Sequence, residues 1–286
     1  MAFDADSLGL HVTTAALLRD VIHERLGLYY EDQRLDTLAD RLAPRVTDRG
    51  FDTFLDYYYF LKYDPAGSQE WHQVMDALSV PETYFWREID QLKAIVDHVV
   101  PRLARRTRRP IRIWSVPCAS GEEPLSLAML LEQCGWFERT SIELCAADAS
   151  QAQLARAAQG VFRDRSLRAL PEALRERFFT AVPGGWRVDA ALHARVRAWH
   201  RLNLAAPADL ALMAQSDIVF CRNVFIYFSD AVVRRIVETL AGLLATPAYL
   251  CIGASESLLR LTDRFELEEI GGAFVYVRGS LETGSV

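Results

Sequence analysis

Downstream of residue 110, short runs of apolar and β-branched residues alternate with segments of helical periodicity. This alternation is the strongest constraint on the fold, because a helix between two strands lets those strands pair in parallel. The pattern predicts an α/β fold with a mostly parallel, doubly wound, Rossmann-like sheet. We expect its strands at residues 111–116, 142–147, 194–200, 217–221, 248–253 and 274–279.

The first 80 residues follow a different pattern. Up to about Met75, apolar residues recur three and four positions apart, with no strand-like alternation. This spacing predicts a small N-terminal helical domain over residues 1–80. We expect helices to stop near Gly27 and Gly50, and the second helix to end or kink at Pro44.

Composition divides the rest of the chain. Residues 81–110 are predicted to form a linker, and its last ten residues, PRLARRTRRP, contain five arginines that we interpret as a solvated helix end. Residues 111–286 form the predicted α/β domain. Within this domain we expect a small β-subdomain at residues 160–200. The segments FFTAV and WRVDA flank a turn at 183–185 and indicate a hairpin added to the sheet.

Charge and hydropathy exclude several classes of protein. The formal net charge of -6 argues against general nucleic-acid binding. The most apolar run, 240–255, is too short to span a bilayer, and the first residues, MAFDADSLGL, lack the basic start of a signal peptide. The five cysteines form no CxxC pair and have no histidine at metal-ligand spacing, so we expect reduced core residues and no metal site. We therefore expect a cytoplasmic protein that does not insert into membranes.

The loop after the first predicted strand, SVPCASGEEP, indicates the kind of ligand. It contains neither GxGxxG nor GK[ST], and Glu122 and Glu123 would repel phosphate but attract a cation. Asp148 ends the second strand, where an acid accepts hydrogen bonds from ribose hydroxyls. S-adenosylmethionine, which carries a ribose, an ammonium and a sulfonium, fits these features. The alternative is equally compatible: acidic residues at a helix start and a capping aspartate occur in any α/β protein.

The segment DIVFCRNVFIYF places Arg222 and Asn223 in the middle of an apolar, strand-like run. Burying these groups without partners costs several kcal/mol. Either the strand ends at Cys221 or a ligand needs the two polar side chains.

WSVPCASGEEPLSLAM and DIVFCRNVFIYF together resemble the CheR family of chemotaxis receptor methyltransferases. ETYFWRE (82–88), RLNL (201–204) and GASES (253–257) are similar to further motifs of that family in the same order. The resemblance extends over nearly the whole chain. It implies a monomeric protein-glutamate O-methyltransferase that methylates the cytoplasmic helices of methyl-accepting chemoreceptors in sensory adaptation and releases S-adenosylhomocysteine.

The resemblance also assigns roles to residues. Arg87 and Tyr227 are implied to face the substrate carboxylate as catalytic residues. The residues implied to touch or line the cofactor pocket are Thr83, Arg87, Glu123, Asp148, Asn203, Leu204, Arg222 and Asn223. Because a glutamate is already ionised at pH 7, methyl transfer needs alignment rather than a general base.

Three positions depart from the family pattern. Pro81 replaces an asparagine, which removes one side-chain hydrogen bond to the cofactor and stiffens the backbone. Ser150 replaces the second acid of a D-x-D motif, whose first acid is present. Leu125 replaces a tyrosine, and we interpret that exchange as packing.

Four arginines of the helical domain are candidates for receptor binding: Arg34, Arg41, Arg45 and Arg49. The first three share a helix face if Pro44 permits, and a basic face would steer acidic receptor helices toward the site. Interleaved aspartates favour an ordinary solvated face, whereas the family resemblance favours docking.

The sequence is compatible with two other functions. The arginine-rich linker would support another methyltransferase substrate, such as RNA or a small acid. Pro81 is the one hint of a non-catalytic regulatory module that binds S-adenosylmethionine. The joint presence of Arg87, Glu123, Asp148, Arg222 and Tyr227 argues against that module.

Overall fold

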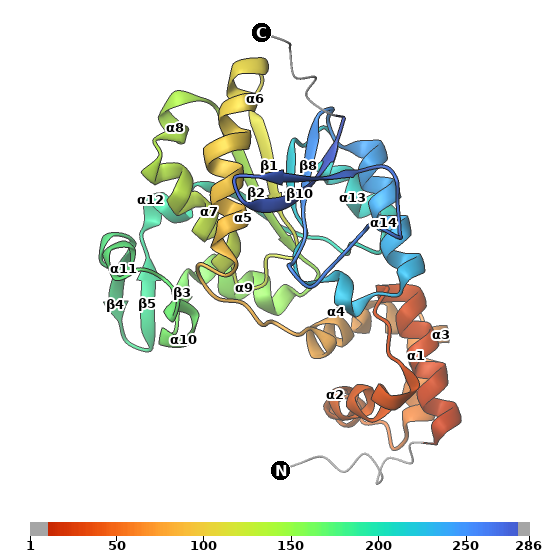
Figure 1. Ribbon diagram of the computed structural model, residues 1–286. Coiled ribbons are helices and arrows are strands. Elements are labelled where there is room, and N and C mark those ends of the chain that lie inside the picture. Colours follow the sequence, from red (N-terminus) through yellow and green to blue (C-terminus); the bar gives the residue numbers. More distant parts are fainter. Residues whose placement is uncertain (1–10, 280–286) are drawn as a thin grey trace.

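The computed structural model describes residues 11–279 and shows a helical domain beneath an α/β domain (Figure 1). The helical domain packs around its own apolar core. Its elements are α1 (Val12–Leu26), η2 (Asp32–Arg34), α2 (Leu35–Asp48), α3 (Phe54–Tyr63) and α4 (Gly67–Leu78).

The predicted helix stops are confirmed at Gly27 and close to Gly50, whose φ angles of 81° and 76° suit glycine. Of the two alternatives predicted at Pro44, the helix end is wrong, because α2 continues to Asp48. Proline removes one backbone hydrogen bond. The helix is stabilised on both sides of Pro44 by its packing in the domain core, which buries Leu42, Ala43 and Val46.

Within residues 11–279, seven strands form the main sheet, in the order β6-β2-β1-β7-β8-β10-β9. The pairs from β6 to β8 are parallel, and β10 and β9 are antiparallel, so the predicted doubly wound α/β class is confirmed. All six predicted strands are present, within two residues at each end. The strands are β1 (Ile111–Ser115), β2 (Ile142–Asp148), β6 (Val196–Arg201), β7 (Ile218–Phe220), β8 (Ala248–Cys251), β9 (Glu266–Ile270) and β10 (Ala273–Arg278).

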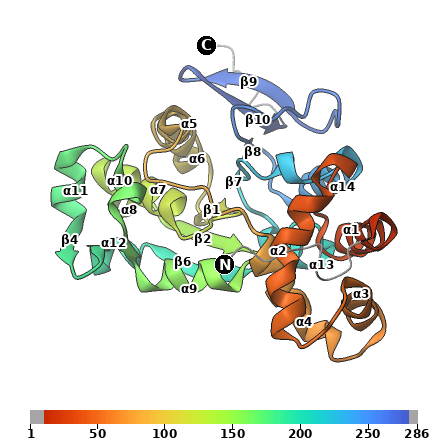
Figure 2. The same cartoon turned by 90° about the horizontal axis from the view of Figure 1, so that it is seen from below.

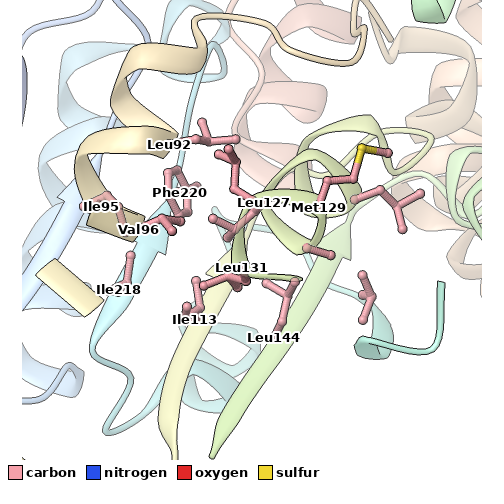
Figure 3. Packing of buried hydrophobic residues seen from close by; sticks show 14 of the residues in the cluster. Leu92, Ile95, Val96, Ile113, Leu127, Met129, Leu131, Leu144, Ile218 and Phe220 are labelled. Carbon is pink, nitrogen blue, oxygen red and sulfur yellow. The ribbon is translucent and has the colours of Figure 1, made fainter. Parts of the chain in front are cut away.

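Apolar clusters cover both faces of this sheet. On one face lie α5 (Ile89–Ala94), η3 (Ile95–Val99), α6 (Val100–Arg106) and α7 (Glu122–Gln133). Figure 3 shows Ile95 and Val96 packed beside Ile218 and Phe220 of the sheet. Much of the segment predicted as a linker is therefore a helical layer of the α/β domain. Its apolar spacing continues up to Leu103, just before the arginine-rich end.

The other elements frame this core. The opposite face of the sheet is covered by α13 (Pro207–Leu210) and α14 (Asp230–Leu243). Connecting elements are α8 (Trp136–Arg139), α9 (Gln151–Gln159), η4 (Ala211–Met213) and η5 (Phe225–Tyr227). None of the helices within residues 11–279 is long and apolar enough to cross a bilayer.

The predicted hairpin exists, but it does not extend the main sheet. β4 (Phe179–Val182) and β5 (Gly185–Val188) pair with β3 (Val161–Phe162) as a separate three-stranded sheet. The strands approach closely at Gly185, where an added Cβ would lie 2.2 Å from a backbone oxygen of β3. This β-subdomain lies to one side of the domain in Figures 1 and 2. Its short helices are α10 (Asp164–Leu167), α11 (Glu172–Phe178) and α12 (Ala190–His193).

The helical domain contacts the α/β domain just beyond the strand ends. The N–H of Tyr29 donates to the carbonyl of Tyr227 at 2.8 Å. Ser150 Oγ donates to Asp76 Oδ1 at 2.6 Å. The helical domain therefore forms one wall of the space beyond the carboxyl ends of β2 and β7.

Candidate active site

A cleft opens beside β1, where the order of the parallel strands in the sheet reverses. β1 pairs with β2 on one side and β7 on the other, and later strands continue outward on both sides. Ligands of doubly wound sheets bind beyond the strand carboxyl ends at such a point. All the predicted cofactor and catalytic residues line this one cleft: Thr83, Arg87, Glu123, Asp148, Asn203, Leu204, Arg222, Asn223 and Tyr227.

Arg222 is buried in the wall of the cleft, with a side chain only 1% exposed. β7 ends at Phe220, so the polar pair follows the strand rather than interrupting it. Nη1 of Arg222 donates to Glu123 Oε2 and Nη2 to Glu88 Oε2, both at 3.0 Å. Nε has no partner among the described residues. The guanidinium is thus anchored by two carboxylates and keeps one buried donor unused.

The two carboxylates respond differently to this setting. Burial raises the pKa of Glu123, although Arg222 and the hydroxyl of Ser115 oppose the shift. Burial also disfavours ionised Glu88, but the hydrogen bond and charge of Arg222 outweigh it and lower the pKa of Glu88. Glu88 is therefore the firmly ionised partner of Arg222 at neutral pH.

Asp148, the last residue of β2, is 6% exposed. Its Oδ2 accepts the N–H of Ala119 and its Oδ1 accepts the N–H of Ser150, both at 2.8 Å. Burial raises the pKa of Asp148, and these two hydrogen bonds counteract part of that rise. Each carboxylate oxygen has a second lone pair, so Asp148 retains the capacity to accept ribose hydroxyls.

This donor set fits S-adenosylmethionine. Three carboxylates, those of Glu82, Glu123 and Asp148, line the cleft beside the two guanidinium groups of Arg87 and Arg222. This balance of charge favours a ligand with positive charge. The start of α7, where a phosphate would bind in other α/β proteins, is occupied by the chain itself. There the buried carboxylate of Glu122 accepts the hydroxyls of Ser120 and Ser166. Glu122 is therefore a structural residue that ties α7 to the β-subdomain.

Arg87 and Tyr227 lie on the wall nearest to the helical domain. Arg87 Nη1 donates to the carbonyl of Glu82 at 2.6 Å, and its side chain is 27% exposed. Its remaining N–H groups leave capacity for a carboxylate. Tyr227 belongs to η5 and is half-buried.

The four candidate arginines of the helical domain do not form one surface. Arg34 and Arg41 line a small groove that shares Tyr227 and Leu28 with the cleft. Arg45 instead points to Glu70, with its Nη2 2.7 Å from Glu70 Oε1. Arg49 also approaches Glu70, at 3.5 Å. Receptor binding remains a prediction for all four, and the geometry favours Arg34 and Arg41.

Sequence reasoning missed three acidic residues around the cleft. Glu88 and Glu256 are the final acids of the ETYFWRE and GASES motif matches, so their motifs offered a signal. Asp76 lies on α4 and offered none, because its partner Ser150 is 74 residues away. Of the departures from the family pattern, Leu125 is fully buried and Pro81 lines the cleft.

Comparison with known proteins agrees with these features. Residues 14–79 match the all-alpha domain of CheR methyltransferases, and residues 81–273 match the SAM binding domain of CheR methyltransferases. The chain is 34% identical to chemotaxis protein methyltransferase 2 of Vibrio cholerae, covering 87% of both proteins. It is 30% identical to chemotaxis protein methyltransferase 1 of Pseudomonas aeruginosa, covering 91% of this chain and 96% of the relative.

A third relative is the probable biofilm formation methyltransferase WspC of Pseudomonas putida. The two are 33% identical, over 90% of this chain and 60% of that relative. The chain therefore belongs to the CheR methyltransferase family and is an S-adenosylmethionine-dependent methyltransferase.

Proposed function

We propose that this enzyme methylates glutamate side chains of methyl-accepting chemoreceptors, giving methyl esters and S-adenosylhomocysteine. One observation carries the proposal: the cleft that holds Arg87 and Tyr227 adjoins a groove lined by Arg34 and Arg41, and the two share Tyr227 as a lining residue. A basic approach to a methyltransferase site suits a substrate whose reactive group and surroundings are acidic.

One group of residues would hold the cofactor, and a second group, Arg87 and Tyr227, would hold the substrate. Asp148 would accept the ribose hydroxyls of S-adenosylmethionine. Glu123 and Glu88, tied to Arg222, would favour its positively charged methionine end. When bound, the cofactor supplies a methyl group bonded to a positively charged sulfur. The other cofactor residues, Thr83, Asn203, Leu204 and Asn223, line the same space.

Arg87 would hold one oxygen of the substrate glutamate and leave the other free to form the new O–C bond. The cofactor would supply the methyl group for this bond, and the electron pair of its C–S bond would remain on the leaving sulfur. No proton moves, because the glutamate enters as a carboxylate. Tyr227 would place its hydroxyl beside the reacting carboxylate. The protein's contribution is thus alignment and the exclusion of water.

The arginine-rich stretch argues against RNA as the substrate. It ends α6 and immediately precedes β1, so it lies at the amino end of that strand. The cleft lies beyond the carboxyl ends. A nucleic acid bound to these arginines would therefore sit at the wrong edge of the sheet.

The decisive experiment incubates the enzyme with labelled S-adenosylmethionine and membranes that contain chemoreceptors. Label that leaves as methanol in mild base identifies a carboxyl methyl ester. Arg87→Ala should abolish transfer while the protein remains folded. Arg105→Ala, an exposed arginine at the end of α6, should transfer at the normal rate. Base-stable label, or no transfer by an enzyme that binds the cofactor, would overturn the proposal.

A further inference from the structure

Four backbone N–H groups converge on the side chain of Glu256. Its Oε1 accepts the N–H groups of Phe225 at 2.6 Å and Ile226 at 3.4 Å. Its Oε2 accepts those of Asn223 at 2.8 Å and Gly253 at 2.7 Å. Both oxygens are therefore committed to the loops after β7 and β8, which carry no regular hydrogen-bond ladder here.

The loop after β7 needs such an acceptor. Asn223 has a φ of 57°, in the left-handed region that non-glycine residues rarely adopt. The loop around it directs successive N–H groups inward, and such concave arrangements bind anions. Here the anion is the chain's own carboxylate. The two loops also touch closely, since a Cβ on Gly253 would lie 2.4 Å from Asn223 Nδ2.

This loop carries the groups that face the ligand. Arg222 and Asn223 line the cleft just before the anchored N–H of Phe225, and Tyr227 lines it two residues later. Glu256 itself is absent from the cleft wall among the described residues. A second carboxylate, Glu88, accepts a hydrogen bond from Asn223 Nδ2 at 3.3 Å.

We propose that Glu256 is a positioning residue, which fixes the loop from Arg222 to Tyr227 in the shape that binds cofactor and substrate. Its effect on the cofactor passes through Arg222 and Asn223. Its effect on the substrate passes through Tyr227 and rests on the proposed function. Glu256 does not line the cleft, so we assign it a positioning role and not a catalytic one.

The test replaces Glu256 with glutamine, which has the same shape. Glutamine replaces one of the two acceptor oxygens with an NH₂ group, so a donor would face the backbone N–H donors. We expect S-adenosylhomocysteine, measured by titration calorimetry, to bind about 10- to 100-fold more weakly. In receptor methylation, kcat should fall more than the KM for receptor rises.

Glu238→Gln is the matched control. Glu238 also accepts two hydrogen bonds, from Thr262 and Arg264, but it lies on α14 away from the cleft. Its substitution should leave S-adenosylhomocysteine affinity and kcat unchanged. Glu256→Asp keeps the charge but is too short to reach both loops, so its affinity should fall between those of Glu256→Gln and the unaltered enzyme.

The outcomes separate a positioning role from a purely structural one. A lowered melting temperature with normal S-adenosylhomocysteine affinity, measured where the variant is fully folded, would overturn the proposal. Failure of both Glu256 variants to fold would make Glu256 a folding determinant and would also overturn it. The calorimetry uses no receptor. If the unaltered enzyme binds S-adenosylhomocysteine but methylates no receptor, the proposed function fails while the test of Glu256 stands.

Discussion

Arg222 and Arg45 each pair with acidic residues inside the protein, but among the described residues only the Arg222 cluster leaves one of its buried groups without a partner. In the helical domain, the buried Glu70 accepts Arg45 Nε at 2.9 Å, Arg45 Nη2 at 2.7 Å and the hydroxyl of Tyr57 at 3.0 Å. In the cleft, Arg222 is held by Glu88 and Glu123 and still has a buried Nε without a partner among the described residues.

The difference shows how to tell a structural ion pair from one that serves a site. The cluster around Glu70 brings together α2, α3 and α4, and its hydrogen bonds close on themselves. The cluster around Arg222 joins the residue before α5, the first turn of α7 and the loop after β7, and Arg222 lies in the wall of the cleft. Buried polar groups are normally satisfied. An unused donor alone does not mark a site, since Trp114 Nε1 and Ser216 Oγ are also buried without partners among the described residues. Arg222 differs from these groups because it also lines the cleft.

The largest effect should come from Arg222→Ala. The substitution removes the anchor of Glu88 and Glu123 and leaves two carboxylates close together. We expect S-adenosylhomocysteine affinity to fall by about 1,000-fold, roughly 4 kcal/mol, in calorimetry. If folded Arg222→Ala binds S-adenosylhomocysteine with nearly unchanged affinity, the Arg222 cluster is purely structural, like the one around Glu70.

Glu70→Ala should give the opposite result. It leaves Arg45 and the hydroxyl of Tyr57 without their acceptor, so the free energy of unfolding should drop by about 3 kcal/mol. Chemical denaturation measures the loss. S-adenosylhomocysteine affinity, measured where the variant remains folded, should not change. A large loss of affinity would mean that the helical cluster also shapes the cleft.

These two arginines also mark how far the sequence can be interpreted. Arg222 stands out because it follows the apolar run DIVFC, where a charged residue requires an explanation. Arg45 does not, because helical spacing groups it with Arg34 and Arg41. Its partner Glu70 lies 25 residues away on another helix. Periodicity predicts which face a residue occupies, but only tertiary packing decides what that face meets.

The dependence on tertiary packing also explains where the predicted fold differs from the structure. Strand and helix positions follow from local pattern, so the main sheet is predicted well. The hairpin at 179–188 is also predicted, but its partner strand β3 is only two residues long and gives no periodic signal. Strand β9, with the sequence ELEEI, is an exposed edge strand and lacks the apolar run of a buried one.

Asp148 provides a smaller test, on the cleft side of the comparison. Asp148→Asn should weaken S-adenosylhomocysteine binding about tenfold at neutral pH, because an amide has one acceptor oxygen where the carboxylate has two. In the unaltered enzyme, the affinity for S-adenosylhomocysteine should decrease as the pH is lowered and Asp148 takes up a proton. Because burial raises its pKa, this loss should begin above the ordinary value of 3.8.

The sign of the pH effect separates binding from folding. A raised folded-state pKa means that protonating Asp148 favours the folded chain, so this group does not cause acid unfolding. Glu88, whose pKa is lowered, contributes stability that is present above 4.5 and is lost only as pH falls through its lower folded value. Affinity should therefore decline at higher pH than stability. Coincident loss of both, followed by calorimetry and circular dichroism, would contradict this order.

The smallest effect should separate two exposed arginines of the helical domain. Arg34 lines the groove beside Tyr227, whereas Arg49 lies near Glu70. Arg34→Ala should raise the KM for receptor about threefold, as expected for one exposed charge at the rim of an interface. High salt should reduce the difference from the unaltered enzyme, because it screens that charge. Arg49→Ala should leave the KM unchanged, and neither variant should alter S-adenosylhomocysteine affinity. Equal increases in KM would mean that receptors contact the whole basic face, including the part that the structure assigns to the closed cluster.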